Sequence, residues 1–276
     1  WMIHANIIAG LISYFCGYKK IVWNLRSSGQ EYSLKKKNFL LFIILIIFSY
    51  FIPKIIVFNS NLSLKNYRKN FLSKKNNQII FNGFEKKKFI NKTYTKTIHY
   101  LCVARNHKIK NHQLLLDAFY LFNKNFSSWK LTLVGRGINL LRNKVKNNPK
   151  YSEIQNKIIF LNEKKNLEPF YRKSNFVILS SKAESFPNIV GEAMSYGTPV
   201  ISTNVGDVEK LILNKNFLVR FQNEISFFKS LMNSSRLYLK KKNYIIYCKK
   251  NKDFIDKNFS IINMLNRFKI INKKLF

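Results

Sequence analysis

From residue 97 onward, short apolar runs rich in β-branched and aromatic residues alternate with longer stretches in which apolar residues recur at helical spacing. In the stretch 113–122, for example, Leu115, Ala118, Phe119 and Phe122 share one helical face. Strands that alternate with helices predict βαβ crossovers and a parallel sheet. The sequence therefore predicts an α/β fold with a doubly wound, parallel sheet. The predicted strands are 98–104, 130–134, 157–161, 176–180, 199–203 and 217–219, and the other predicted helices are 167–173, 188–196 and 208–213.

Ligands of open parallel sheets bind at the carboxyl ends of the strands, so these ends are where chemistry is expected. The first informative end is Val103-Ala104-Arg105, which a short loop joins to the next helix. Arg105 and Lys110 would converge near a helix N-terminus, a place suited to phosphate. Because basic residues are frequent in this chain, a solvated pair is the alternative.

The second informative end is the run LVGRG at 133–137. Gly135 and Gly137 would let the backbone pass close to a ligand or make a tight turn. The run lacks the third glycine of a dinucleotide-binding fingerprint. An ordinary turn is therefore the alternative for this piece taken alone.

The third and most specific end is 180–194, with the sequence SSKAESFPNIVGEAM. A strand leads into a loop that holds Glu184, and Pro187 stands just before a helix that carries Glu192. Asn188 suits the N-cap position, and the amides of the first helical turn suit an anionic phosphate. Glu192 offers a carboxylate for hydroxyl groups, and its alternative role is a helix-favoured glutamate near the N-terminus.

The N-terminal part is less regular, and its longest apolar run is 39–52. This run is shorter than the roughly 20 residues that span a bilayer. It predicts a buried or interfacial helix, with a core helix preferred, although the lysines at 35–37 would suit anionic headgroups. Strands are expected at 55–58 and 78–81, a polar linker at 85–96, and a basic helical region from about 237.

The chain begins with Trp1 and shows no basic, apolar and small-residue pattern of a signal peptide, which indicates a truncated gene product or a partial sequence. Its three cysteines form no CxxC pair. This argues against a zinc site or a disulfide framework and fits a reducing cytosol.

The charge is extreme, because 49 Lys and Arg face 13 Asp and Glu, for a net +36. One interpretation is a polyanionic partner such as nucleic acid, an acidic membrane or a phosphorylated substrate. The preferred interpretation is codon bias, since Lys, Asn, Ile and Phe all have A/T-rich codons. The basic residues are also scattered, whereas a nucleic-acid reader concentrates them on one face.

The segment 184–205 resembles the signature of retaining glycosyltransferases of the glycosyl transferases group 1 family. It holds two glutamates separated by seven residues, followed by E-A-x-x-x-G-x-P-V. The segment 103–119 is similar to the family's V-x-R-x-x-x-x-K-x-H block, and 133–137 to its L-V-G-x-G strand end. Further similar segments, in the family's order, are 82–84, 205–207, 258–260 and, from the interior of its N-terminal domain, 1–6.

The resemblance implies a GT-B architecture of two Rossmann-like domains with parallel sheets. It implies a partial acceptor-side domain at 1–92, a nucleotide-sugar-binding domain at 93–250 and a C-terminal helix at 251–276 that packs back toward the N-terminal domain. The implied reaction moves a hexosyl unit from a nucleotide sugar to a lipid-linked or polysaccharide acceptor with retention of configuration. No cofactor and no metal are implied, and the expected location is the cytoplasm, with peripheral contact to the anionic inner face of the membrane.

The resemblance also implies roles. Arg105 and Lys110 would bind the donor diphosphate and stabilise the leaving group, which replaces a metal ion by fixed positive charge. Glu192 would hold the ribose hydroxyls, and Glu184 would lie beside the transferred sugar. The other implied donor-binding residues are Gly135, Gly137, Phe186, Pro187, Asn188 and Ile189. His4 matches a histidine on the acceptor side, although a lone histidine is more often structural.

The chain departs from the family pattern at three positions, where Ser185 and Asn162 replace Gly and Asn175 replaces Asp. The family's opening βαβ portion is also missing, which would leave half a domain with an exposed sheet edge. A truncated, inactive homologue is therefore the alternative function. A basic nucleic-acid-binding protein is less favoured, and a phosphorylase-like activity least, because no lysine anchored for a pyridoxal cofactor can be identified.

Overall fold

The computed structural model describes residues 3–29, 36–74, 76–90, 92 and 94–275. The chain forms two compact units. Unit 1 comprises Trp1–Gly83, Glu184–Pro187 and Ile261–Phe276, and unit 2 comprises Phe84–Ala183 and Asn188–Ser260. The units thus divide at 83/84 and 260/261, whereas the sequence predicts domain boundaries at 92/93 and 250/251.

Unit 1 is built on a small parallel sheet in the order β1-β2-β3. Its strands are β1 (Val22–Leu25), β2 (Ile55–Phe58) and β3 (Asn77–Ile79), and its helices are α1 (Ile3–Phe15), α3 (Lys36–Phe48), α4 (Asn61–Lys69) and α11 (Ile261–Leu275). In the described part of the chain, β1 pairs with β2 alone and lies at the edge of the sheet.

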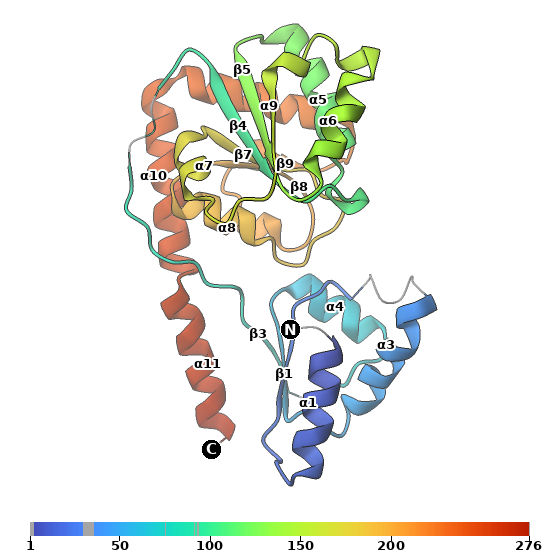
Figure 1. Ribbon diagram of the computed structural model, residues 1–276. Coiled ribbons are helices and arrows are strands. Elements are labelled where there is room, and N and C mark those ends of the chain that lie inside the picture. Colours follow the sequence, from blue (N-terminus) through green and yellow to red (C-terminus); the bar gives the residue numbers. More distant parts are fainter. Residues whose placement is uncertain (1–2, 30–35, 75, 91, 93, 276) are drawn as a thin grey trace. The chain divides into compact units, whose positions relative to one another are not determined.

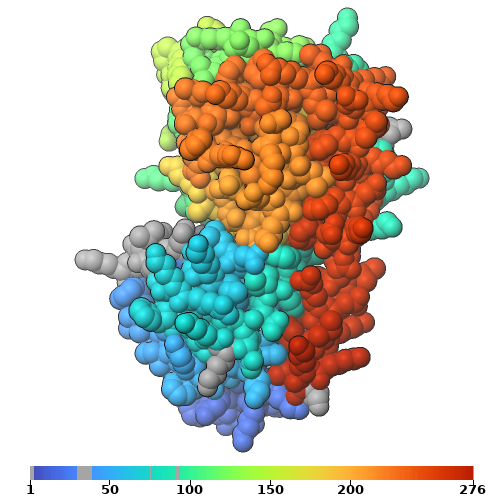
Figure 2. Space-filling model, turned by 180° about the vertical axis from the view of Figure 1, so that it is seen from behind, coloured from blue at the N-terminus to red at the C-terminus, as the bar shows by residue number. Residues whose placement is uncertain are grey.

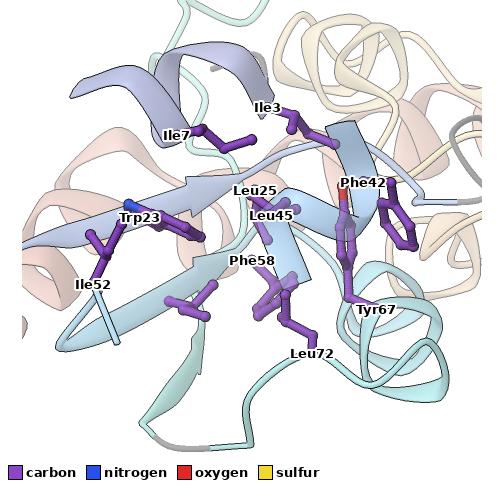
Figure 3. Close-up of a cluster of buried hydrophobic side chains, with 11 residues drawn as sticks. Ile3, Ile7, Trp23, Leu25, Phe42, Leu45, Ile52, Phe58, Tyr67 and Leu72 are labelled. Atoms are coloured by element: carbon purple, nitrogen blue, oxygen red, sulfur yellow. The ribbon is translucent and has the colours of Figure 1, made fainter. Parts of the chain in front are cut away.

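All four residues of β2 are buried, because helices cover both faces of the sheet. Ile56 and Phe58 join a cluster with residues of α1, α3 and α4 (Figure 3). Ile55 and Val57 point the other way and pack with Ile271 of α11. Figure 1 shows α1 and α11 on opposite sides of β1.

The structure confirms the strand expected at 55–58 and places the next one at Asn77–Ile79 instead of 78–81. The apolar run 39–52 lies largely in α3, whose Phe42 and Leu45 are buried, whereas Leu40 and Ile47 are exposed. One side of the helix is therefore a core face, and the interfacial alternative stays open for the other side. Lys35 and the side chains of Lys36 and Lys37 lie outside the described residues.

Unit 2 is built on a six-stranded sheet in the order β6-β5-β4-β7-β8-β9, in which every pair is parallel. The chain starts in the middle at β4, moves outward to β6, returns beside β4 and then moves the other way. This is the predicted doubly wound sheet. The strands are β4 (Ile98–Val103), β5 (Trp129–Val134), β6 (Ile158–Leu161), β7 (Phe176–Leu179), β8 (Val200–Thr203) and β9 (Leu218–Val219).

The helices of unit 2 connect these strands and then cover the sheet. They are α5 (His112–Asn125), α6 (Ile138–Lys146), α7 (Glu168–Lys173), α8 (Asn188–Ser195), α9 (Glu224–Leu239) and α10 (Lys241–Asn258). Figure 2 shows α9 and α10, in orange to red, forming the outer surface of unit 2 on that side.

The helix predicted at 208–213 is wrong. The structure has a single 3₁₀ turn there, Val208–Lys210, and a second one at Lys215–Phe217. Val208 and Leu211 are buried, so the apolar residues are core side chains of a compact connection. The connection between β8 and β9 is thus made of two short turns.

Within the described residues, no helix is both long enough and apolar enough to cross a membrane. The apolar helix α3 buries only one side against the sheet.

Candidate functional site

A cavity of about 380 Å³ opens at the carboxyl ends of β4, β5 and β6 in unit 2. Three predicted site residues, Arg105, Lys110 and Gly135, lie in its lining. Its other lining residues are Val103, Ala104, Val134, Arg136, Glu163, Lys164 and Leu167. The strand ends chosen from the sequence thus meet around one opening, as expected for a doubly wound sheet.

Four basic residues and one acidic residue line this cavity. Arg136 and Lys164 join Arg105 and Lys110, and Glu163 is the acid. Arginine and lysine side chains fixed around a concave site favour an anionic ligand such as a phosphate group. Arg136 and Lys164 were not predicted from the sequence, although both lie within three residues of the end of a predicted strand, which was the available signal.

Backbone hydrogen bonds continue past the ends of the strands and hold the floor of the cavity. The N–H of Asn106 donates to the carbonyl of Arg136 at 2.8 Å, and the N–H of Gly135 donates to the carbonyl of Leu161 at 3.1 Å. A Cβ atom at Gly135 would lie 2.2 Å from the carbonyl oxygen of Ala104. This position therefore requires glycine, because the two strand ends approach too closely for any side chain.

Gly137 occupies the next turn of the same loop, with φ of 78° just before α6. Glycine adopts this left-handed conformation without strain. Gly135 thus permits the close approach of two strand ends, and Gly137 permits a left-handed turn in the same loop. Their role in donor binding remains a prediction.

The loop that carries Arg105 and Lys110 is held by three hydrogen bonds. The buried His112 places Nε2 3.2 Å from the carbonyl oxygen of Arg105, so that Nε2 is the protonated nitrogen. Burial lowers the pKa of His112, which favours the neutral ring. Ser180 Oγ donates to the carbonyl of Lys110 at 2.8 Å, and the N–H of Lys182 donates to that of Ile109 at 2.7 Å.

These contacts fix the backbone on both sides of the two basic residues. Arg105 itself is exposed and Lys110 is half-buried, so their side chains can meet a ligand from a rigid loop. Ser180 was not predicted from the sequence. A polar residue directly after the buried strand β7 was its only signal.

Glu192 lies in α8 and is half-buried. Its Oε2 accepts a hydrogen bond of 2.8 Å from the hydroxyl of Tyr171, in α7. Burial, and then the charge of Glu192, raise the pKa of Tyr171 far above its usual range. Tyr171 therefore stays a donor and orients the carboxylate, and this partner was missed from the sequence.

The α7 segment is in turn held by Lys92, which was expected in an irregular polar linker. Lys92 is buried, and its Nζ donates to the carbonyls of Tyr171 and Arg172 at 2.6 and 3.1 Å and to Oγ1 of Thr198. Burial lowers the pKa of Lys92 to about 7. The described residues of 85–96 form no helix or strand, in line with the predicted linker, and within it Lys92 packs as a cap on the carboxyl end of α7.

The loop Glu184–Pro187 belongs to unit 1. Ser185 is buried there, and its Oγ donates to Oδ1 of Asn59 at 2.8 Å and lies 2.9 and 2.6 Å from Oγ of Ser60 and Ser63. The ring of Phe186 stacks on Phe81 with centroids 5.4 Å apart. Ser185, where the family usually has glycine, is thus a packed polar contact.

The remaining predicted residues are spread over both units. His4 is exposed in the first turn of α1, and Glu184 is half-buried in its loop. Pro187 is buried and Ile189 half-buried at the start of α8. Asn188 was expected as N-cap, but it is the first helical residue of α8, because the proline before it already ends the loop. Arg105, Lys110 and Gly135 are therefore the predicted residues that the structure brings together around one cavity.

Two of the three cysteines, Cys102 and Cys248, are buried, and burial raises their pKa values to about 12 and about 11. Cys16 is exposed. Among the described residues, no three His, Cys, Asp or Glu side chains lie close enough together to hold a metal ion.

Comparison with known proteins shows what this part of the chain is similar to. Residues 97–233 match the family model described as glycosyl transferases group 1. An uncharacterized glycosyltransferase of Haemophilus influenzae is 29% identical over 154 residues, which are 54% of this chain and 42% of that protein. The N-acetyl-alpha-D-glucosaminyl L-malate synthase of Bacillus anthracis is 30% identical over 112 residues, 40% of this chain and 28% of that enzyme. The chain thus spans less than half the length of these relatives.

Solved structures agree on the fold. Anabaena HepE in complex with UDP superposes with a TM-score of 0.83 at 15% identity, covering 99% of this chain and 77% of that one. The predicted fold class, an α/β protein of the GT-B type with parallel sheets, is confirmed by this likeness. The cavity described above lies within residues 97–233, the segment that is similar to the glycosyl transferases group 1 family.

Proposed function

We propose that the protein is a glycosyltransferase that moves a hexosyl unit from a nucleotide sugar to a lipid-linked or polysaccharide acceptor. The observation that carries the proposal is the cavity at the carboxyl edge of unit 2, where Arg105, Lys110, Arg136 and Lys164 surround a rigid, glycine-containing floor. Such a site suits a compact anion with two or more charges. A nucleoside diphosphate has this chemistry.

The donor that fits this reasoning is a UDP-sugar, because the Anabaena protein of the same fold was solved with UDP. Arg105 and Lys110 bind the diphosphate and stabilise the charge that develops on it when the sugar leaves. Cations carried on a loop whose backbone is held by hydrogen bonds need less reorganisation during the reaction, and preorganised charge is often the largest contribution to catalysis. No metal and no further cofactor are part of the proposal.

Glu192 is assigned to the ribose hydroxyls. A carboxylate accepts hydrogen bonds from two neighbouring hydroxyls, and Tyr171 holds it in one orientation. Gly135 and Gly137 provide the close backbone, and the segment from Phe186 to Ile189 lines the sugar and phosphate pocket.

Glu184 lies beside the transferred sugar in the proposal and stabilises oxocarbenium-like charge on it. The transfer retains the anomeric configuration, in line with the two glutamates separated by seven residues, 184 and 192. His4 is assigned to the acceptor side. The reaction takes place in the cytoplasm, with peripheral contact to the inner face of the membrane.

A truncated, inactive homologue is not favoured, because Arg105, Lys110, Glu184 and Glu192 are all retained. A general nucleic-acid-binding function is not favoured either, since residues 97–233 match an enzyme family in their own right.

Donor binding tests the proposal directly. We would titrate UDP, GDP and their sugars by calorimetry into the chain, into Arg105→Ala and Glu192→Ala, and into Arg142→Ala as a control. Arg142 is an exposed arginine of α6 that is absent from the cavity lining. Saturable binding that the first two substitutions weaken tenfold or more, about 1.4 kcal/mol, is the expected result. No binding by a folded sample, or equal losses in all three variants, would contradict the assigned site.

A further inference from the structure

The edge of the unit 1 sheet at which the strands begin carries a repeated pattern of exposed aromatic and basic residues. We call the surface formed by residues 15–20, 50–54 and 71–74 the amino edge. Each of its three segments leads from a helix into a strand, and each presents an aromatic ring followed by lysine. The rings are 81% (Phe15), 68% (Tyr18), 49% (Tyr50), 73% (Phe51) and 79% (Phe71) exposed. The lysines are Lys19, Lys20, Lys54 and Lys74, all exposed.

Hydrogen bonds join the three segments into one surface. The N–H of Lys54 donates to the carbonyl of Ile21 at 2.8 Å, which ties the second segment to the first. The hydroxyl of Tyr50 donates to the carbonyl of Phe71 at 2.8 Å, which ties the second to the third. Figure 1 shows α1 descending to this end of unit 1, where β1 turns back from it. The amino edge is therefore continuous.

The apolar surface extends from the amino edge along two helices. On α1, Ile8 and Ile12 are exposed one turn apart. On α3, Leu40 and Ile47 are exposed two turns apart, and Phe51 is exposed three residues after the helix ends. Contiguous exposed apolar surface of this kind marks an interaction site in a water-soluble protein.

The charge of residues 1–83 favours an anionic partner. Residues 1–83 contain 12 lysines and arginines and a single acidic residue, Glu31, which lies outside the described residues. Aromatic rings at the level of lipid headgroups, with lysines that reach the phosphates above them, form the usual interfacial pattern of membrane proteins. A nucleic acid would not need the aliphatic faces of α1 and α3.

We propose that the amino edge docks unit 1 on an anionic lipid bilayer, with Phe15, Phe51 and Phe71 inserted among the headgroups and the four lysines on lipid phosphates. This gives the membrane contact of the proposed function a location. Its evidence is independent of the donor site, so either proposal can fail while the other stands. The lysines supply long-range attraction that salt weakens, and the rings supply insertion that salt does not weaken.

The test is co-sedimentation of the full chain with vesicles of phosphatidylcholine alone and of phosphatidylcholine and phosphatidylglycerol in equal amounts. A charge variant replaces Lys19, Lys20, Lys54 and Lys74 by Gln, and an aromatic variant carries Phe51→Ser and Phe71→Ser. Matched controls in unit 2 replace the exposed Lys240, Lys242, Lys249 and Lys250 by Gln, or carry Phe221→Ser and Leu140→Ser. We expect binding to the anionic vesicles only, and a loss on the order of a hundredfold or more in the charge variant.

Insertion is measured separately by fluorescence. We expect brominated lipids to quench the new tryptophan of Phe51→Trp and not that of Phe221→Trp, the control in unit 2. Equal losses in the unit 2 charge control would assign vesicle binding to net charge and overturn the proposal. So would a dimer, seen by light scattering, that the aromatic variant dissociates, because the amino edge would then join two copies. Calorimetry of UDP on the same variants is expected to be unchanged, which separates this test from that of the donor site.

Discussion

The hydroxyl of Tyr171 donates a hydrogen bond of 2.8 Å to Oε2 of Glu192 and so joins α7 to α8. The two residues are 21 positions apart in sequence. Because Tyr171 is buried and the carboxylate is only half-buried, the tyrosine is the fixed member of the pair. The orientation of Glu192 is therefore set before any ligand arrives.

Tyr171→Phe is expected to weaken binding of the nucleotide sugar about fivefold to tenfold, or about 1 kcal/mol, because Glu192 loses its orienting donor. Calorimetry measures the affinity. Tyr196→Phe is the matched control, since its hydroxyl donates to Glu168 in the same aromatic cluster and not to Glu192. Equal effects of the two substitutions would contradict a specific role for Tyr171.

Most of the unit 2 sheet could be predicted from the sequence, and the reason is burial. All four residues of β7 and all four of β8 are buried, and β7 is an unbroken apolar run. The predicted limits of all six strands are within one residue of the observed ones. The edge strand β1 was missed. Its Asn24 bonds to the side chain of Asn6 through both its N–H and its carbonyl, a tertiary contact that no local pattern shows.

The same limit applies to the candidate site. Arg105, Lys110 and Glu192 stand in recognisable motifs next to strand ends, so they could be selected from the sequence. Tyr171 and Lys92 stand in stretches without a motif. Their positions depend on how α7 and α8 pack, which the linear sequence does not show.

Gly135→Ala is expected to lower the free energy of unfolding by about 1–3 kcal/mol and to weaken UDP binding, because the new methyl group would overlap the carbonyl of Ala104. Gly137→Ala, in the same loop, is the control, because it introduces backbone strain without a steric overlap with the backbone. Its nearest neighbour is a side-chain atom at 3.4 Å, so it incurs about 1–2 kcal/mol of left-handed strain without moving the strand end. Thermal melting and UDP titration of both variants are the measurements. If Gly135→Ala bound UDP with the wild-type affinity, Gly135 would not be part of the UDP site.

Gly191→Ala in α8 is expected to destabilise the protein, although alanine is the better helix former by about 1 kcal/mol. A Cβ atom there would lie 2.0 Å from the ring of Phe84, and the overlap outweighs the helix preference. In a Phe84→Ala background the ring is gone, so the same glycine substitution should become neutral or stabilising. Urea unfolding of the four proteins measures this change of sign, and a substitution that destabilises equally in both backgrounds would show that the ring is not the cause.

Lys92 is expected to make stability rise with pH. Burial lowers its pKa in the folded protein from 10.5 to about 7, so between these values the unfolded chain binds the extra proton. The cost of burying the charge is thus fully present below pH 7 and disappears as the pH rises. From pH 7 to pH 9, the wild type should gain about 2 kcal/mol in free energy of unfolding relative to Lys92→Met.

The control for this prediction is Lys88→Met, an exposed lysine of the same segment, which should follow the wild-type pH profile. Urea unfolding at several pH values measures all three proteins. If the profiles of Lys92→Met and the wild type run parallel, Lys92 keeps its proton in the folded state.

The place of α11 in unit 1 has a consequence for synthesis on the ribosome. Ile271 of this helix covers Ile55 and Val57 of β2, yet α11 is translated only after the whole of unit 2. Translation proceeds at about 5–20 residues per second, so roughly 10–40 s pass before α11 can cover this face of the sheet. Of the two units, unit 1 thus begins to emerge first and is completed last. Until then the uncovered face of β2 is an apolar binding site for a chaperone.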